Sequence, residues 1–487
     1  MSLAESDKST AAAAPPGRAP SRYASRSLTE GSIPKTLWFL AWPSIVSGLL
    51  QTLDNLAKLV WAGALGFVAL ASIGVAQGWV QLFNSARQGL DTASRAMIAR
   101  AVGEGDIERA NHVGVQSLIF NGTISFSMAL IGILFVDFLL QILGVSGEIV
   151  EQGRTYLQLR FISTTSFAML WCSGNMLAAS GDTMTPMKAQ MIARILYIVT
   201  GPFLVFGWLG LPVMGLPGAA IAAPVGQLSG SVLTFNALFT GKSRLHLSFK
   251  GVRPDFPLYW RMIQLGAPAS WTQGERSVSQ LILVGIVAPF GDTVLAAYSL
   301  IQRLQFFFNL GQLGLGQAAG VLAGQNLGAR KLERAKQTTW WALGYCCLLS
   351  GVVGAVVLAF PTLFLTIFTR EPHLLEAAIP WLRVVIFGFM VLGMANVFTQ
   401  VFNTAGDTLL PTLVSAASVW FVQQPWALML SGSEPHWELF GWQFSLPVVL
   451  DLGDIGIAWA MMLAIFVRVL IFFPYFLWGP WWKKKVY

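Results

Sequence analysis

Long apolar stretches alternate with short polar segments along almost the whole chain. A helix needs about 20 apolar residues to cross a bilayer, and each of these stretches reaches that length. The pattern predicts an all-α integral membrane protein with twelve transmembrane helices, at residues 36–61, 68–94, 112–136, 154–178, 187–209, 216–239, 258–286, 293–322, 337–360, 377–402, 411–431 and 453–478. Residues 1–33 are rich in Ala, Pro, Ser and Arg and have no apolar core, which predicts a disordered tail.

An internal repeat divides the chain in two. The stretch Gly181-Asp182-Thr183, followed by Pro186, returns 225 positions later as Gly406-Asp407-Thr408, followed by Pro411. The same offset relates Pro43 to Pro268, Gly66 to Gly291, Gln77 to Gln302, Asn84 to Asn309, Gly103 to Gly328 and Glu108 to Glu333. A constant offset over separate matches indicates a duplicated half-protein rather than a short repeat.

The repeat predicts two six-helix bundles, residues 34–240 and 258–480. A polar cytoplasmic linker at 241–257 joins them, and a basic cytoplasmic tail at 481–487 follows the second. Six spans per half is an even number, so both halves enter the membrane in the same orientation, related by a pseudo-two-fold axis along the membrane normal. The interface between the bundles is then the natural place for a binding site.

Composition supports a membrane protein and bears on its orientation. Hydrophobic residues make up 55% of the chain and charged residues only 11%, against roughly 25% charged residues in a soluble domain. The net charge of +8 arises from Lys and Arg between the apolar stretches, so it predicts orientation rather than nucleic-acid binding. These basic segments fall on one side, which predicts cytoplasmic termini for a multi-pass protein of the plasma (bacterial inner) membrane.

Redox, metal and catalytic chemistry are not expected. Three cysteines, two of them adjacent at Cys346-Cys347, cannot form a disulfide framework, and four scattered histidines make no metal-ligand cluster. A membrane enzyme would need His, Ser or carboxylates clustered at one depth, and the sequence shows no such cluster. We therefore expect no cofactor and no enzymatic activity.

Two predicted helices carry a stripe of amide side chains. In the second helix the polar residues recur at steps of four and three, at Gln77, Gln81, Asn84, Gln88 and Asp91. In the eighth helix the same pattern appears at Gln302, Gln305, Asn309 and Gln312. Such steps place each set on one helix face, and a polar face turned to lipid would leave hydrogen bonds unmet. The stripes predict a water-filled cleft shared by the halves, with hydrogen bonding between helices as the alternative.

Charged pairs lie on the first and seventh predicted helices. After Pro43, the first helix carries Gln51, Asp54 and Lys58, with the acid one turn before the base in the favourable order for an ion pair. After Pro268, the seventh helix carries Glu275 and Arg276. Ionisable residues inside a membrane are candidates for function by default, although a self-neutralised structural pair is the alternative. We predict Asp54, paired with Lys58, as the principal proton-responsive site, with Asp91 and Glu275 as further candidates for ion coupling.

The repeated Gly-Asp-Thr motif falls at a predicted cytoplasmic turn between two helices. There Gly can end one helix, Asp or Thr can cap the next, and Pro suits its first turn. A structural turn is the simpler interpretation. The alternative is a cytoplasmic latch that holds neighbouring helices while the two halves move.

The duplicated halves and their motifs together resemble the multidrug and toxic compound extrusion (MATE) family of transporters, over residues 34–480 or nearly so. The motifs that carry the resemblance are Pro43 with Gln51-Thr52, Ala62-Gly63-Ala64-Leu65-Gly66 with Leu70-Ala71, Gly324-Gln325-Asn326-Leu327-Gly328-Ala329, and the two Gly-Asp-Thr stretches. The resemblance implies a V-shaped pair of bundles that alternates between inward-open and outward-open states. It also implies export of organic, often cationic, compounds in exchange for protons or sodium ions.

The coupling residues of that family are replaced in this chain. Where many relatives carry an aspartate after the first-helix proline, this sequence has Lys58, with Asp54 one turn earlier. In the fifth helix Tyr197 stands where proton-coupled relatives often have an asparagine, and Gly201 precedes Pro202. The seventh-helix acid of sodium-type relatives would fall at Arg276, and the tenth-helix acid near Leu392.

These observations predict a secondary active exporter of small organic solutes that works as a monomer in the lipid bilayer, exchanging solute for protons or sodium. Its cavity is predicted at Gln51, Gln77, Gln81, Asn84, Gln88, Tyr197, Arg276, Gln302, Gln305 and Asn309. The alternative is a flippase or exporter of lipid-linked or anionic solutes. Arginines facing the cavity, with Arg87, Arg194, Arg276 and Arg303 as candidates, would favour that alternative.

Overall fold

The computed structural model describes residues 28–142, 147–210, 212–432, 438–439, 442–443 and 450–487, so residues 1–27 of the predicted tail lie outside the described part. The helices of the first half are α1 (Ile33–Leu65), α2 (Phe67–Glu104), α3 (Ile107–Leu134), α4 (Val136–Ile142), α5 (Gly147–Ser180), α6 (Met184–Phe206), η1 (Trp208–Gly210) and α7 (Leu216–Phe239). Those of the second half are α8 (Phe256–Val287), η2 (Ala288–Phe290), α9 (Asp292–Gly328), α10 (Leu332–Ala359), α11 (Pro361–Leu365), α12 (Pro372–Ala405), α13 (Leu409–Ala417), η3 (Ser418–Gln423), α14 (Gln424–Ser431), α15 (Ile455–Trp478) and η4 (Trp481–Lys483). Strands β1 (Glu438–Leu439) and β2 (Trp442–Gln443) pair antiparallel in the insertion between α14 and α15.

The predicted twelve-helix architecture is confirmed. The described part of the chain contains six long helices in each half, with α13, the π-helical η3 and α14 forming one continuous helix in the second. Eight of these helices are long and apolar enough to cross a membrane by length and composition. The other four, α2, α5, α8 and α9, carry many of the polar residues that line the central cavity described below.

Some helices extend well beyond the predicted ends. Helix α2, predicted to end at residue 94, continues to Glu104 and stops at Gly105, whose φ of 81° is left-handed. Its charged residues ended the apolar stretch in the sequence, but the apolar residues between them, such as Met97 and Ala99, are fully buried. Tertiary packing therefore prolongs a helix that local hydrophobicity alone does not predict.

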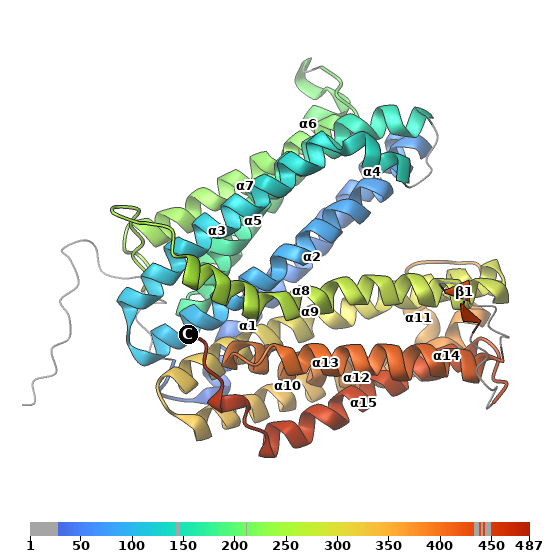
Figure 1. Ribbon diagram of the computed structural model, residues 1–487. Coiled ribbons are helices and arrows are strands. Elements are labelled where there is room, and N and C mark those ends of the chain that lie inside the picture. The colour runs from blue at the N-terminus through green and yellow to red at the C-terminus, as the bar shows by residue number, and fades with distance from the viewer. Residues whose placement is uncertain (1–27, 143–146, 211, 433–437, 440–441, 444–449) are drawn as a thin grey trace, which may run out of the picture.

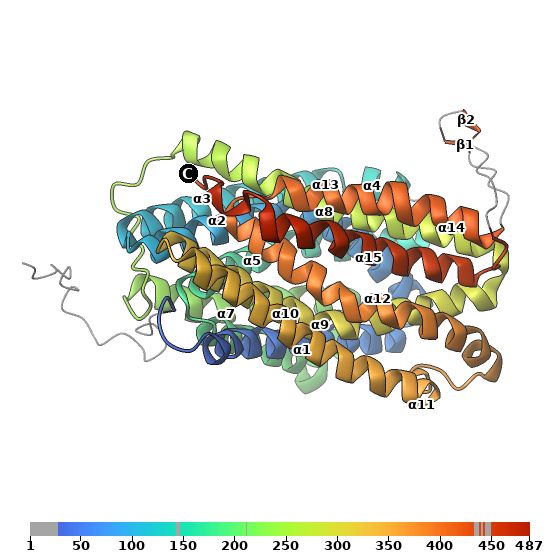
Figure 2. The ribbon, with the colours of Figure 1, turned by 90° about the horizontal axis from the view of Figure 1, so that it is seen from below.

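The two halves form two lobes arranged as a V (Figure 1). The lobes meet at the end where the C terminus lies, here called the closed end, and diverge toward the end that bears α4, α11 and β1, here called the open end. Seen from below, the long helices of the second lobe run side by side along the length of the molecule (Figure 2). Packing occurs mainly within each lobe, through α5, α6 and α7 in the first and α9, α12 and α15 in the second.

Helices α1 and α8 pass from one lobe to the other. The first turns of α1, with Leu37 and Leu40, pack in the core of the second lobe, whereas Trp61 near its end packs against Tyr197 of the first. Helix α8 does the reverse: Met262 lies in the first-lobe core and Ile286 in that of the second. Each of these repeat-related helices therefore begins in the opposite lobe and ends in its own lobe, which joins the lobes at the closed end.

The chain terminus also spans the closed end. Trp481 is fully buried in the second-lobe core, while Val486 is buried in the cluster formed mostly by the first lobe. The Tyr487 hydroxyl donates a hydrogen bond to the carbonyl of Met97 on α2, and Arg261 on α8 donates to the carbonyls of residues 485 and 486. The last seven residues are therefore fixed between the two lobes.

The two copies of the Gly-Asp-Thr motif have different contacts. The Asp182 carboxylate accepts hydrogen bonds from the backbone N–H groups of Met184 and Thr185, at 3.2 and 3.0 Å, and so caps the start of α6. In the second copy, Asp407 accepts a hydrogen bond from the Tyr475 hydroxyl on α15, and its Oδ1 lies 3.9 Å from the Nζ of Lys484. The first copy is thus a local turn, and the second also connects α15 and the C-terminal segment.

Candidate functional site

A cavity of about 770 Å³ lies between the two lobes and is lined by residues of both. Among the residues predicted for the site, those that line it are Gln51, Asp54, Lys58, Gln77, Gln81, Asn84, Gln88, Asp91, Glu275, Arg276, Gln302 and Gln305. Tyr197 and Asn309 are buried and are not among the lining residues. Tyr197 instead packs on Trp61, and the Lys58 Nζ lies 5.3 Å from the centre of its ring.

The amide stripe of α2 faces the cavity over its whole length, whereas that of α9 turns away partway. Gln302 and Gln305 line the cavity, but Gln312 is buried inside the second lobe. Its amide donates hydrogen bonds to the Ser350 hydroxyl at 2.8 Å and to the Phe389 carbonyl at 2.9 Å. Hydrogen bonding between helices, the alternative for the stripes, therefore holds for Gln312.

One carboxylate on α1 holds two cations of the first lobe. Asp54 is only 2% exposed, and its Oδ2 accepts hydrogen bonds from Lys58 Nζ at 2.9 Å and from the guanidinium of Arg194 on α6. Arg160 on α5 also lines the cavity within electrostatic range of Lys58. The predicted pair of Asp54 and Lys58 is present, but it belongs to a cluster in which positive charge exceeds negative charge.

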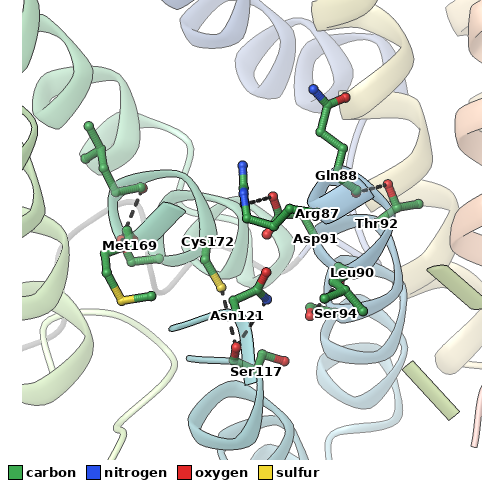
Figure 3. A network of polar contacts seen from close by, with 12 residues as sticks. Arg87, Gln88, Leu90, Asp91, Thr92, Ser94, Ser117, Asn121, Met169 and Cys172 are labelled. Carbon is green, nitrogen blue, oxygen red and sulfur yellow. Dashed lines mark hydrogen bonds and ion pairs between the residues drawn. The ribbon is translucent and has the colours of Figure 1, made fainter. Parts of the chain in front are cut away.

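A second ion pair lies on α2. Arg87 and Asp91 are both almost fully buried and form an ion pair one turn apart, next to Cys172 on α5 and Asn121 on α3 (Figure 3). Asp91 also lines the cavity. Arg95, one turn further, donates a hydrogen bond to the side-chain oxygen of Gln400 on α12 and so connects the two lobes. Asp91 is thus hydrogen-bonded to Arg87 and lies within electrostatic range of Arg95, whose own hydrogen bond goes to a neutral amide.

The second lobe presents an acid and two arginines to the cavity. Glu275 on α8 is 6% exposed, and neither of its carboxylate oxygens has a hydrogen-bond partner among the described residues. Arg468 on α15 lies within electrostatic range of Glu275 and Arg276, but its guanidinium donates to the Ser418 hydroxyl at 2.9 and 3.1 Å. Ser418 is the first residue of η3, a short π-helical segment of the kind often found at functional sites.

The comparisons with known proteins agree with this geometry. A family model described as MatE matches residues 43–203 and again 268–429. The chain belongs to the MatE family. The two matches start at Pro43 and Pro268, the repeat-related prolines inside α1 and α8, so each MatE unit corresponds to one half of the internal repeat.

Individual MatE relatives match most of the chain at low identity. The probable multidrug resistance protein YoeA of Bacillus subtilis is 24% identical over 411 residues, covering 83% of this chain and 88% of that protein. The outward-facing structure of a multidrug resistance MATE family transporter superposes with a TM-score of 0.84 at 21% identity, covering 95% of this chain and 98% of the other. A Pyrococcus furiosus transporter, described as having a binding pocket of reverse polarity, gives a TM-score of 0.83 at 21% identity and covers 96% of this chain and 100% of its own.

Several lining residues of this MatE chain were not predicted from sequence. Arg160 and Tyr156 on α5 line the cavity, as do Phe167 and Trp171, whose rings stack with centroids 5.6 Å apart. Their spacing of four, seven and four residues along α5, which keeps them on one helix face, was a signal that could have found them. Of the arginines proposed to face the cavity, Arg194 and Arg276 do so, whereas Arg87 and Arg303 are not among the lining residues.

Proposed function

We propose that this MatE protein is a secondary active exporter of small organic solutes, including drugs or toxic metabolites, that works as a monomer by alternating access. The observation that carries the proposal is a polar cavity between two repeat-related lobes that meet at one end and diverge at the other. A solute bound there can reach only one side at a time if the lobes move as units. The names of the related proteins, multidrug resistance protein and multidrug resistance transporter, support this class of solute.

We further propose that the closed end lies in the cytoplasm. The basic segments of the chain support this orientation, because Arg109 and the Lys483-Lys484-Lys485 run lie near that end and such residues favour the cytoplasmic side. The present conformation is then outward-open, and export requires a second state in which the closed end separates. We place the protein in the plasma membrane, which in a bacterium is the inner membrane.

Proton exchange is the coupling that we propose, on Asp54 and Glu275. Asp54 is held by Lys58 and Arg194, so solute or motion that draws these cations away would leave its carboxylate without a partner. Glu275 has no hydrogen-bond partner among the described residues, and an ionised carboxylate is costly to bury without one. Glu275 is therefore the group suited to carry a proton while the cavity is empty, and Asp54 the group that responds to solute. Sodium exchange at the same carboxylates is the alternative.

A flippase or exporter of lipid-linked or anionic solutes is the second candidate. The observation that favours it is the charge of the cavity, which is lined by six basic and three acidic side chains: Lys58, Arg95, Arg160, Arg194, Arg276 and Arg468 against Asp54, Asp91 and Glu275. Neither the position of the cavity within the membrane nor the MatE family of the chain favours an enzymatic function.

Transport by the purified protein in lipid vesicles tests the proposal. Vesicles containing the protein are given an imposed proton gradient, then a sodium gradient, then neither, and the flux of fluorescent organic dyes is followed. We expect one gradient to accelerate dye flux over that in vesicles without protein. Dye flux equal to that of protein-free vesicles under every gradient would contradict the proposal.

A further inference from the structure

Two arginines of the cavity have no partner for their charge among the residues that the structure describes. Arg160 on α5 and Arg276 on α8 both line it, and neither makes a hydrogen bond or ion pair with any described residue. A guanidinium group stays protonated at all physiological pH values, so these side chains cannot relieve their charge by losing a proton. They face the cavity from opposite lobes.

The neighbouring acids are already engaged or out of reach. Asp54 accepts from both Lys58 and Arg194, so one negative charge is shared by two positive charges before Arg160 is considered. Arg276 has Arg468 within electrostatic range, which adds a repulsion, and it forms no ion pair with the adjacent Glu275. On each side of the cavity the basic side chains therefore outnumber the acidic ones, by three to one around Asp54 and by two to one around Glu275.

The same wall of the cavity also offers aromatic surface. Phe167 and Trp171, two and three turns beyond Arg160 on α5, stack on each other and line the cavity. Arginine binds carboxylate, sulfonate and phosphate groups through paired hydrogen bonds, and aromatic rings bind flat apolar bodies. A site with both features suits a solute that is apolar over most of its surface and negatively charged at one end.

The geometry points to organic anions as the solutes of this transporter, bound through Arg160 on α5 and Arg276 on α8. This inference rests on the proposed export function and specifies its substrate class. A cation would meet six basic side chains and only Glu275 as an acid without a salt-bridge partner. An anionic group would satisfy Arg160 and Arg276 and would compete with Asp54 for Lys58 and Arg194. The anionic group can belong to a soluble solute or to a lipid headgroup.

Two dyes of one ring skeleton and opposite charge provide the test. Fluorescein is an anionic xanthene and rhodamine 6G a cationic one, and the concentration dependence of the transport of each is measured in vesicles containing the full-length protein. A third arm follows the movement of fluorescent phosphatidylglycerol between leaflets, which separates a lipid headgroup from a soluble anion. The variants are R160Q and R276Q, with R160K and R276K as charge-preserving partners. The matched control is R303Q, because Arg303 is exposed on α9 and is not among the lining residues.

We expect fluorescein to be preferred and both Gln variants to raise its KM by roughly tenfold, the scale of one lost charge-assisted hydrogen bond. The Lys variants should recover part of the loss, and R303Q should match the wild type. Transport of the phosphatidylglycerol alone, with the same sensitivity to R160Q, would also support the anion site and would identify the anion as a lipid. Unchanged thermal unfolding of the Gln variants would show that they fold.

Transport of rhodamine 6G without fluorescein or phosphatidylglycerol would overturn the inference and leave the exporter intact. An unchanged fluorescein KM in both R160Q and R276Q would overturn it too. If none of the three probes moves faster than in protein-free vesicles, the proposed export function fails and the inference fails with it.

Discussion

Gly328 on α9 lies directly against its repeat counterpart Gly103 on α2, where the two lobes meet at the closed end. A Cβ atom placed on Gly328 would lie 3.0 Å from the Gly103 Cα and 2.3 Å from the Arg100 carbonyl oxygen. A Cβ on Gly103 would lie 2.1 Å from the Gln325 carbonyl oxygen. The backbones of α2 and α9 touch here because neither residue has a side chain, so these glycines allow the lobes to close.

Substituting either glycine is expected to weaken the closed end. G328A should lower the free energy of unfolding by about 1–3 kcal/mol, since the added methyl group must displace backbone. G344A is the control, because a methyl group on Gly344 inside α10 would meet no atom within 4 Å among its neighbours and should add about 0.5–1 kcal/mol of stability. Thermal unfolding in detergent measures both. Equal midpoints for G328A and G344A would show that the contact is not needed.

Asp54 provides a second prediction. D54N leaves Lys58 and Arg194 without their shared acid, so we expect a loss of about 2 kcal/mol of stability. We also expect most of the flux driven by a proton gradient to disappear. D137N is the matched control, since Asp137 forms a 3.0 Å ion pair with Arg154 that is half-exposed and not among the cavity-lining residues.

The D54N experiment is measured as dye flux with and without a pH gradient, alongside thermal unfolding. A folded D54N protein whose proton-driven flux equals that of the wild type would refute the role of Asp54. In that case E275Q becomes the decisive variant, because Glu275 is the other acid that we propose for coupling.

The repeat, the twelve helices and the amide-lined part of the cavity could be predicted from the sequence, because each follows from local spacing or from a constant offset. The pairing of Asp54 with Arg194 could not, since these residues are 140 positions apart and no periodicity relates them. The passage of α1 and α8 from one lobe to the other could not be predicted either. The two ends of each helix enter different lobe cores, and their apolar composition is too similar to tell which core each end enters. The burial of Gln312 inside the second lobe could not be predicted because it depends on hydrogen-bond partners on α10 and α12.

The start of α8 is fixed to the first lobe by a pH-dependent contact. The His112 ring on α3 donates a hydrogen bond of 2.9 Å to Asp255, and the Leu258 backbone N–H donates another at 3.1 Å. These bonds, first that from His112, lower the pKa of the Asp255 carboxyl. A lowered pKa in the folded state means that the stabilisation is present above the ordinary carboxyl pKa and is lost as the pH falls through the folded value.

D255N should therefore unfold at a lower temperature than the wild type at pH 7, and the difference should shrink as the pH falls below about 4. D292N is the control, because Asp292 is exposed in the first turn of α9, where its side chain caps no backbone group of the described residues. Thermal unfolding from pH 3 to pH 8 gives the comparison. A difference between D255N and wild type that stays constant over this range would contradict the assignment.

Alternating access is the central claim, and the distance between the lobes at the closed end tests it most directly. Glu108 and Glu333 are repeat counterparts, both near that end, one in the first turn of α3 and one in that of α10. Spin labels on E108C and E333C, in a chain whose three native cysteines are replaced, report their separation by double electron–electron resonance. We predict one short distance for the empty protein and a second, longer one when fluorescein is added. A single unchanged distance with and without a transported dye would contradict the account.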